Sequence, residues 1–171
     1  DLNPKNQLFK EVILVKNTKV KIGIVGSGFA ANFHFRSYSK IPGNDIEIVS
    51  VYSRNYEKCC QFAHQRGINP ASSVEELIEN VDIVDLCISG KKKKKYTVQA
   101  LAAERYVILE KPFTGYYGPE NKENFLGNQF SKEIMLEESL KSARRMLKAE
   151  EKSKGIIFYA EDWIYSPSVQ K

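Results

Sequence analysis

The segment VKIGIVGSGFAA, residues Val20–Ala31, decides the fold class of this chain. Its first half, Val20–Val25, is a short run rich in β-branched residues, which is typical of a buried parallel strand. A glycine turn follows, and Phe29–Ser39 then has the pattern of a helix that ends before Pro42. The order of strand, glycine turn and helix predicts the first βα unit of an α/β protein.

The same alternation continues along the rest of the chain. Strands are expected at residues 46–51, 81–88, 106–109 and 156–160, and helices at residues 56–66, from Ser73, at 96–104 and at 131–153. Leu136, Leu140, Ala143 and Leu147 share one stripe of the last helix. Because crossovers between parallel strands are right-handed, this order predicts a doubly wound parallel sheet of the Rossmann type.

The composition is that of a globular domain. The 171 residues are 42% hydrophobic and 27% charged, and no apolar run reaches the roughly 18 residues that cross a bilayer. The net charge of +5 equals that of one run, Lys91–Lys95, so nucleic-acid binding is the least favoured interpretation. Three cysteines, Cys59, Cys60 and Cys87, give no disulfide framework, and they favour a reduced, cytoplasmic setting.

The glycine turn carries the first functional motif, G-x-G-x-x-A. Gly26 permits a tight turn, Gly28 lets a pyrophosphate approach the backbone, and Ala31 lets the helix pack close to the strand. The free amides of the helix N-terminus would attract the phosphates. The predicted cofactor-binding residues here are Gly26, Ser27, Gly28, Phe29, Ala30 and Ala31. The alternative is a turn that merely joins strand and helix.

The end of the second strand indicates which dinucleotide is bound. NAD-binding folds usually place a carboxylate there for the ribose diol, whereas this chain has Ser53 followed by Arg54. A hydroxyl and a guanidinium can both contact a 2′-phosphate. The sequence therefore favours NADP over NAD, although an exposed arginine without a ligand would look the same.

A second motif, Glu110-Lys111-Pro112, follows the strand at 106–109. Ligands bind at this carboxyl edge in open α/β sheets, so Lys111 could hold a substrate hydroxyl or carbonyl and assist proton transfer. Taken alone, a Lys-Pro pair at a strand end is usually a solvated turn.

Together the two motifs resemble those of the Gfo/Idh/MocA oxidoreductases, the family of glucose-fructose oxidoreductase and inositol dehydrogenase. The resemblance covers residues 20–171 and rests on KIGIVGSG (21–28), VDLCIS (84–89), VILEKPF (107–113) and AEDWIYSP (160–167). It implies a nicotinamide-dependent enzyme acting on sugars, polyols or cyclitols, with Lys111 as the catalytic residue. By the same resemblance, the cofactor would also be lined by Ile88, Ser89, Gly90, Lys93, Glu110, Lys111, Pro112 and Tyr165.

Two departures from the family pattern stand out. Ser89 replaces a usual proline, and Lys93 stands where a histidine would fall. The run Lys91–Lys95 is expected to form a loop that is mobile unless an anion binds. The family also has a second α/β domain. We therefore expect an extension at 1–18, a dinucleotide-binding domain at 19–165 and the start of a truncated domain at 166–171. Such a chain would bind cofactor with little or no turnover.

The remaining candidates have less specific explanations. His34 is expected to be a packing or capping residue, His64 a surface residue and Cys60 the core residue of its pair, and no metal site is expected. Tyr116 and Tyr117 could line a sugar site by stacking. A non-catalytic dinucleotide sensor remains the alternative function. A small-molecule substrate and no membrane partner are expected, and a homo-oligomer is possible.

Overall fold

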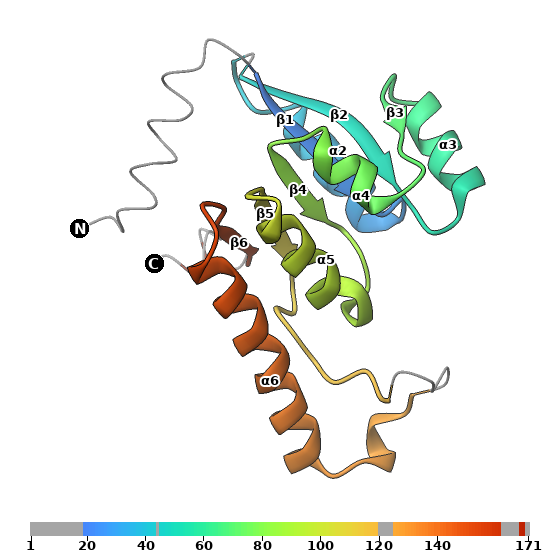
Figure 1. Ribbon diagram of the computed structural model, residues 1–171. Coiled ribbons are helices and arrows are strands. Elements are labelled where there is room, and N and C mark those ends of the chain that lie inside the picture. The colour runs from blue at the N-terminus through green and yellow to red at the C-terminus, as the bar shows by residue number, and fades with distance from the viewer. Residues whose placement is uncertain (1–18, 44, 120–124, 162–167, 170–171) are drawn as a thin grey trace.

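Six parallel strands form one sheet at the centre of the protein (Figure 1). The computed structural model describes residues 19–43, 45–119, 125–161 and 168–169. The strands are β1 (Val20–Val25), β2 (Ile46–Tyr52), β3 (Asn69–Pro70), β4 (Ile83–Leu86), β5 (Tyr106–Glu110) and β6 (Ile157–Ala160). Their order across the sheet is β3-β2-β1-β4-β5-β6, the doubly wound dinucleotide-binding order. The predicted fold class is confirmed.

Helices cover both faces of this sheet. They are α2 (Phe29–Tyr38), α3 (Tyr56–His64), α4 (Val74–Glu79), α5 (Gly90–Ala102) and α6 (Lys132–Glu151), with a 3-10 turn η1 at Gly127–Gln129. Side chains cap three of them at the N-terminus: the Asn55, Ser73 and Ser131 oxygens accept hydrogen bonds from helix amides. Residues 73–76 (Ser-Val-Glu-Glu) have the spacing of a capping box, in which the Glu76 amide donates to the Ser73 hydroxyl. The Glu76 carboxylate accepts from the Ser72 amide instead of from that of Ser73.

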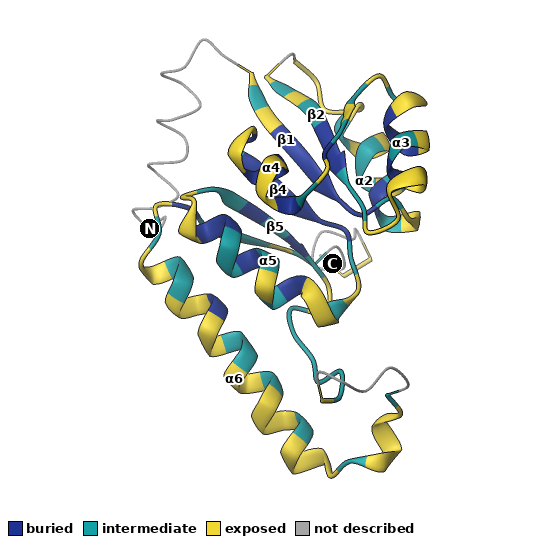
Figure 2. Ribbon diagram, turned by 45° about the vertical axis from the view of Figure 1, so that its right-hand side comes forward, coloured by how far each residue is buried: buried dark blue, intermediate teal, exposed yellow. Residues whose placement is uncertain are grey.

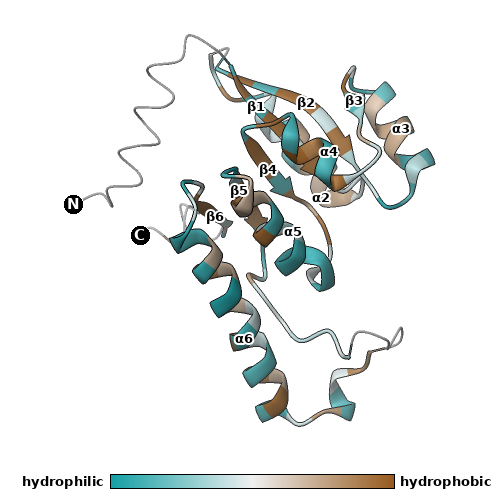
Figure 3. Ribbon diagram, in the orientation of Figure 1, coloured by the Kyte–Doolittle hydropathy of each residue, from teal (hydrophilic) through white to brown (hydrophobic). Residues whose placement is uncertain are grey.

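The core has two parts, one on each face of the sheet. Cys59, Phe62 and Ala63 of α3 pack with Ala31 of α2 over Ile24 and Val51. On the other face α4, α5 and α6 contribute Val74, Leu77, Ile78, Ala100, Leu101 and Met146, which pack over Val84, Leu86, Val107 and Leu109. The central strands β1 and β4 are accordingly the most deeply buried ones (Figure 2), and they are strongly hydrophobic (Figure 3).

The lysine run lies in a helix, which corrects the expectation of a mobile loop. Helix α5 begins at Gly90, six residues before the expected start at Tyr96, and includes Lys91–Lys95. Lysine is a good helix former, and like charges three or four positions apart on a helix cost only about 0.2–0.5 kcal/mol per pair, so the run is compatible with a helix. Lys93 is buried with 3% of its surface exposed, whereas Lys92 and Lys95 face solvent.

One packing expectation was also wrong. Cys59, not Cys60, is the core cysteine of α3: it is fully buried and its thiol donates to the Val51 carbonyl at 3.3 Å. The apolar stripe of α6 is exposed at Leu140 and Leu147, because the helix packs on α5 through the fully buried Met146 instead. Every helix in the described part of the chain is too short or too polar to cross a membrane.

Candidate functional site

The predicted site residues meet at the carboxyl edge of three neighbouring strands. In the parallel register Val25 of β1 lies opposite Leu86 of β4, and Leu86 lies opposite Leu109 of β5. The segments that follow these strands therefore start side by side, at Gly26, Cys87 and Glu110. This is the edge at which ligands bind in open α/β sheets.

The glycine turn has the backbone that the motif requires. Gly26 has a φ of +122°, and an ideal Cβ there would lie 2.4 Å from the Cys87 carbonyl oxygen, so only glycine fits between β1 and β4. An ideal Cβ at Gly28 would meet nothing within 4 Å. Gly28 is the N-cap of α2 and makes no side-chain cap, so the first turn of the helix keeps its amides for a ligand. These features fit the phosphates of a dinucleotide.

The other residues of the turn lie on two sides of the helix start. Ala31 is fully buried in the core beside Ile24, as expected of the small residue that brings helix and strand together. Phe29 is 88% exposed, and Ala30 is partly buried. Ser27 reaches sideways, and its hydroxyl donates to the Ser53 hydroxyl at 2.9 Å. The structure thus brings Ser53 next to the turn, and Arg54 follows as an exposed residue.

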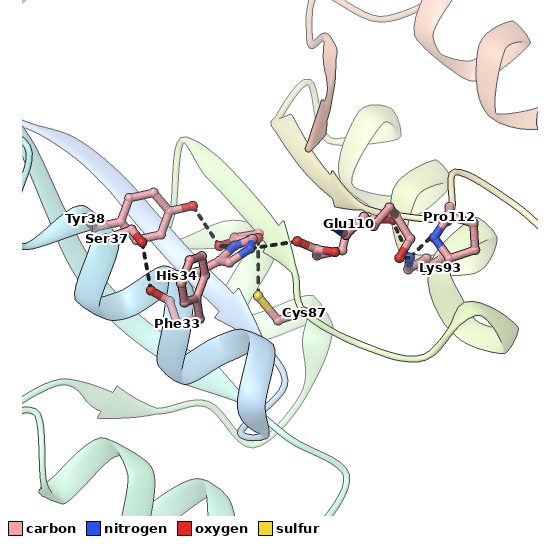
Figure 4. A network of polar contacts seen from close by, with 10 residues as sticks. Phe33, His34, Ser37, Tyr38, Cys87, Lys93, Glu110 and Pro112 are labelled. Atoms are coloured by element: carbon pink, nitrogen blue, oxygen red, sulfur yellow. Dashed lines mark hydrogen bonds and ion pairs between the residues drawn. The ribbon is translucent and has the colours of Figure 1, made fainter. Parts of the chain in front are cut away.

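The Glu110–Pro112 segment lies at the end of β5, and its backbone is held by a lysine from α5. The Lys93 ammonium donates to the carbonyls of Glu110, Lys111 (3.1 Å) and Pro112 (3.0 Å), and Figure 4 shows it beside them. Burial lowers the pKa of Lys93, and the three carbonyls compensate in part for its lost hydration. Lys93, which was predicted to bind cofactor, therefore has its ammonium group engaged by this segment. Lys111 itself is exposed, and the Lys111–Pro112 peptide bond is cis.

His34 lies at the centre of a buried polar network, which corrects its assignment as a packing or capping residue. Its Nδ1 lies 2.8 Å from an Asp85 carboxylate oxygen, and its Nε2 lies 3.0 Å from a Glu110 carboxylate oxygen (Figure 4). Hydrogen bonding to Asp85 outweighs burial and raises the pKa of His34 to about 9. At neutral pH the ring is an imidazolium that donates to both carboxylates.

Asp85 is the buried anchor of this network. The Tyr38 hydroxyl donates to it at 2.7 Å and the Cys87 thiol at 3.5 Å, and its side chain is fully buried. Burial raises the pKa of Tyr38 and of Cys87, with the Asp85 charge adding to both. Possible ligand atoms of His34, Asp85 and Cys87 lie within 4.8 Å of one another, a grouping that sequence analysis missed. The signal for it was a charged residue inside an apolar strand.

The remaining predicted residues lie around this edge. Ser89 is the exposed N-cap of α5, and the Tyr117 hydroxyl occupies the space where a Cβ of Gly90 would lie. Ile88 packs against the part of the core that contains Leu86 and Leu109. Tyr116 packs edge-on against Phe125 and Phe130, with centroids 5.3 and 5.4 Å away, so this ring belongs to a loop cluster. Tyr165 lies outside the described residues.

Comparison with models of protein families shows which family this chain belongs to. A model described as "Oxidoreductase family, NAD-binding Rossmann fold" (Gfo/Idh/MocA) matches residues 20–121. The chain belongs to this family. This Gfo/Idh/MocA chain is 31% identical over 93 residues to trans-1,2-dihydrobenzene-1,2-diol dehydrogenase of Mus musculus, a match covering 53% of this chain and 28% of that enzyme. The resemblance inferred from the two motifs is confirmed.

Solved structures share the fold of this Gfo/Idh/MocA chain. The WlbA dehydrogenase from Bordetella pertussis, in complex with NADH and UDP-GlcNAcA, superposes with a TM-score of 0.73 at 19% identity, covering 91% of this chain and 39% of that one. Biliverdin reductase from Synechocystis, in complex with biliverdin and NADP+, superposes with a TM-score of 0.67 at 18% identity, covering 88% and 40%. The chain thus spans about two fifths of these structures.

Proposed function

We propose that this chain binds NADP in preference to NAD, through residues 19–165, for a dehydrogenase that moves a hydride to or from a sugar, polyol or cyclitol. The open space at Gly28 carries the proposal. A Cβ there would meet no protein atom within 4 Å, next to a helix start without a side-chain cap. A pyrophosphate needs such a close approach to free amides.

The preference for NADP rests on the end of β2. No carboxylate occurs in the sequence between Glu47 and Glu57, so nothing in this segment repels a 2′-phosphate. Ser53 accepts a hydrogen bond from Ser27 and keeps its own hydroxyl hydrogen for a further acceptor. Arg54 adds an exposed cation next to it.

The proposed chemistry at the substrate depends on Lys111. The nicotinamide, when bound, supplies the hydride acceptor or donor. When a carbonyl is reduced, the Lys111 ammonium donates a hydrogen bond to its oxygen and then gives it a proton. When an alcohol is oxidised, its carbon loses a hydride and its hydroxyl loses a proton, and the amine form of Lys111 accepts that proton. The bound sugar of WlbA and the diol named for the mouse enzyme support a hydroxylated ring as substrate.

Calorimetry with NADP+ and NAD+ on the 171-residue chain tests the proposal. Because the chain spans about two fifths of the matched structures, the test measures cofactor binding and not turnover. We expect the chain to bind both cofactors, NADP+ more tightly, and Gly28→Val to abolish binding while the melting temperature stays within a few degrees. Gly127→Val, in η1 on the far loop, is the matched control and should bind as the parent does. Unchanged affinity of Gly28→Val would reject the assignment.

A further inference from the structure

Two cations from different helices hold the segment that carries Lys111. His34 of α2 donates from Nε2 to the Glu110 carboxylate at 3.0 Å, and Lys93 of α5 donates to the carbonyls of Glu110, Lys111 and Pro112. The contact of His34 fixes the side chain of Glu110, which precedes Lys111. The contacts of Lys93 fix the backbone on both sides of Lys111. In Figure 4 the two cations lie on opposite sides of Glu110.

The orientation of the His34 ring is fixed by a hydrogen bond to a buried carboxylate. Its Nδ1 donates to Asp85, whose side chain is fully buried at the end of β4. Asp85 in turn accepts from the Tyr38 hydroxyl at 2.7 Å, one helical turn along α2 from His34. Because Asp85 is anchored on the sheet, the ring cannot rotate without breaking its hydrogen bond to a buried carboxylate, and its Nε2 is therefore directed at Glu110.

From this geometry we propose that His34 is a positioning residue, which sets the place of the Lys111 amine by holding the Glu110 carboxylate. Its helix begins at the glycine turn, so the same rigid element places the cofactor turn and steadies the lysine segment. The importance of Lys111 in this proposal rests on the proposed function. The contact between His34 and Glu110, and its effect on the position of Lys111, do not depend on the proposed function.

Asparagine and glutamine separate the two contacts of the ring. An asparagine amide takes the place of Nδ1 and can donate to Asp85, whereas a glutamine amide extends to the place of Nε2 and can donate to Glu110. If His34 acts through Glu110, His34→Gln should retain the parent's behaviour and His34→Asn should lose it. If His34 serves only the buried core around Asp85, the order is reversed.

The readouts need neither cofactor nor turnover. Deuterium exchange is followed in the peptide that covers residues 106–113, with the Val20–Val25 strand as internal reference. The rate of acetylation of Lys111 is measured by mass spectrometry relative to exposed Lys92. We expect His34→Asn to increase exchange in residues 106–113 about tenfold, because losing a charge-assisted hydrogen bond favours local opening. The relative labelling rate of Lys111 should change by about threefold or more in the same variant.

Three comparisons decide the outcome. His34→Gln should match the parent in both readouts, and His64→Asn, at the exposed histidine of α3, should do so too. Glu110→Ala removes the acceptor without touching Asp85, so its Lys111 labelling should differ from that of the parent by about threefold or more. This comparison holds even if His34→Asn folds poorly. Equal labelling in the asparagine and glutamine variants, or parent-like labelling in Glu110→Ala, would overturn the proposal. Calorimetric binding of NADP+ by the parent tests the proposed function separately.

Discussion

The Ser27 hydroxyl donates to the Ser53 hydroxyl at 2.9 Å, so the first glycine turn and the end of β2 are joined by a side-chain hydrogen bond. The two residues are 26 positions apart in sequence. The bond therefore links the expected pyrophosphate site to the expected ribose site. Ser53 is followed directly by the exposed Arg54.

Arg54→Ala should weaken NADP binding more than NAD binding. Only NADP carries the 2′-phosphate, and a hydrogen bond to a charged group contributes about 1.5–3 kcal/mol, of which an exposed arginine should realise the lower part. We therefore expect about a tenfold loss for NADP+ and less than about a twofold loss for NAD+ by calorimetry. Arg144→Ala, at an exposed arginine of α6, is the control. Equal losses for the two cofactors would show that Arg54 does not contact the phosphate.

Alanine at the two glycines of the turn should have opposite effects. Gly26→Ala places a Cβ 2.4 Å from the Cys87 carbonyl at a φ of +122°, and we expect it to destabilise the fold by about 2 kcal/mol or more. Gly28→Ala points into open space and should change the free energy of unfolding by less than about 0.5 kcal/mol. Urea denaturation measures both. Equal stability of the two variants would contradict the positions of the two Cβ atoms.

Lys93→Met should destabilise the chain by about 1–3 kcal/mol, because three backbone carbonyls lose a buried donor. Methionine keeps the length and apolar character of the side chain. Lys92→Met on the exposed side of the same helix should change stability by less than about 0.5 kcal/mol. Chemical denaturation of the two variants separates the buried lysine from the rest of the run, and a neutral Lys93→Met would contradict its role.

The stability of the chain should fall as pH rises from about 6.5 to about 9. The pKa of His34 is raised from 6.5 to about 9, so the folded state binds more protons than the unfolded state in this window. The stabilisation by His34 is complete below pH 6.5 and is lost as the pH rises through about 9. Melting temperatures measured across this range should fall more steeply for the parent than for His34→Gln, which has no titrating ring. Parallel curves would show that His34 does not carry a raised pKa.

Two substitutions on α6 test which of its faces is packed. Met146→Ala should cost about 2–4 kcal/mol, because Met146 is fully buried against α5. Leu140→Ala should cost less than about 1 kcal/mol, because 44% of Leu140 is exposed. Thermal or urea denaturation gives both values. A larger effect at Leu140 would mean that its side of the helix is covered in solution.

The sequence by itself predicted the glycine turn and every strand of the described sheet except the two-residue β3 (Asn69–Pro70). Val20–Val25 is the first strand in both the prediction and the structure, because β-branched periodicity and glycine placement act over a few residues. The family followed from two motifs that are local as well, at Gly26–Ala31 and at Glu110–Pro112. Lys91–Lys95 was interpreted wrongly because repulsion between like charges was weighed alone, without the helix propensity of lysine or the three backbone carbonyls that accept from Lys93.

Only the tertiary structure decided how the candidate site is held together. His34 is 51 residues from Asp85 and 76 from Glu110 in sequence. The parallel register of β4 and β5 brings the two carboxylates to one edge, and the packing of α2 on the sheet brings His34 to them. Similarly, Lys93 reaches the Glu110–Pro112 carbonyls because α5 packs beside β5. Local patterns specify which segments form strands and helices. Which buried charges meet depends on strand register and helix packing, and these are fixed by hydrogen bonds and contacts between distant parts of the chain.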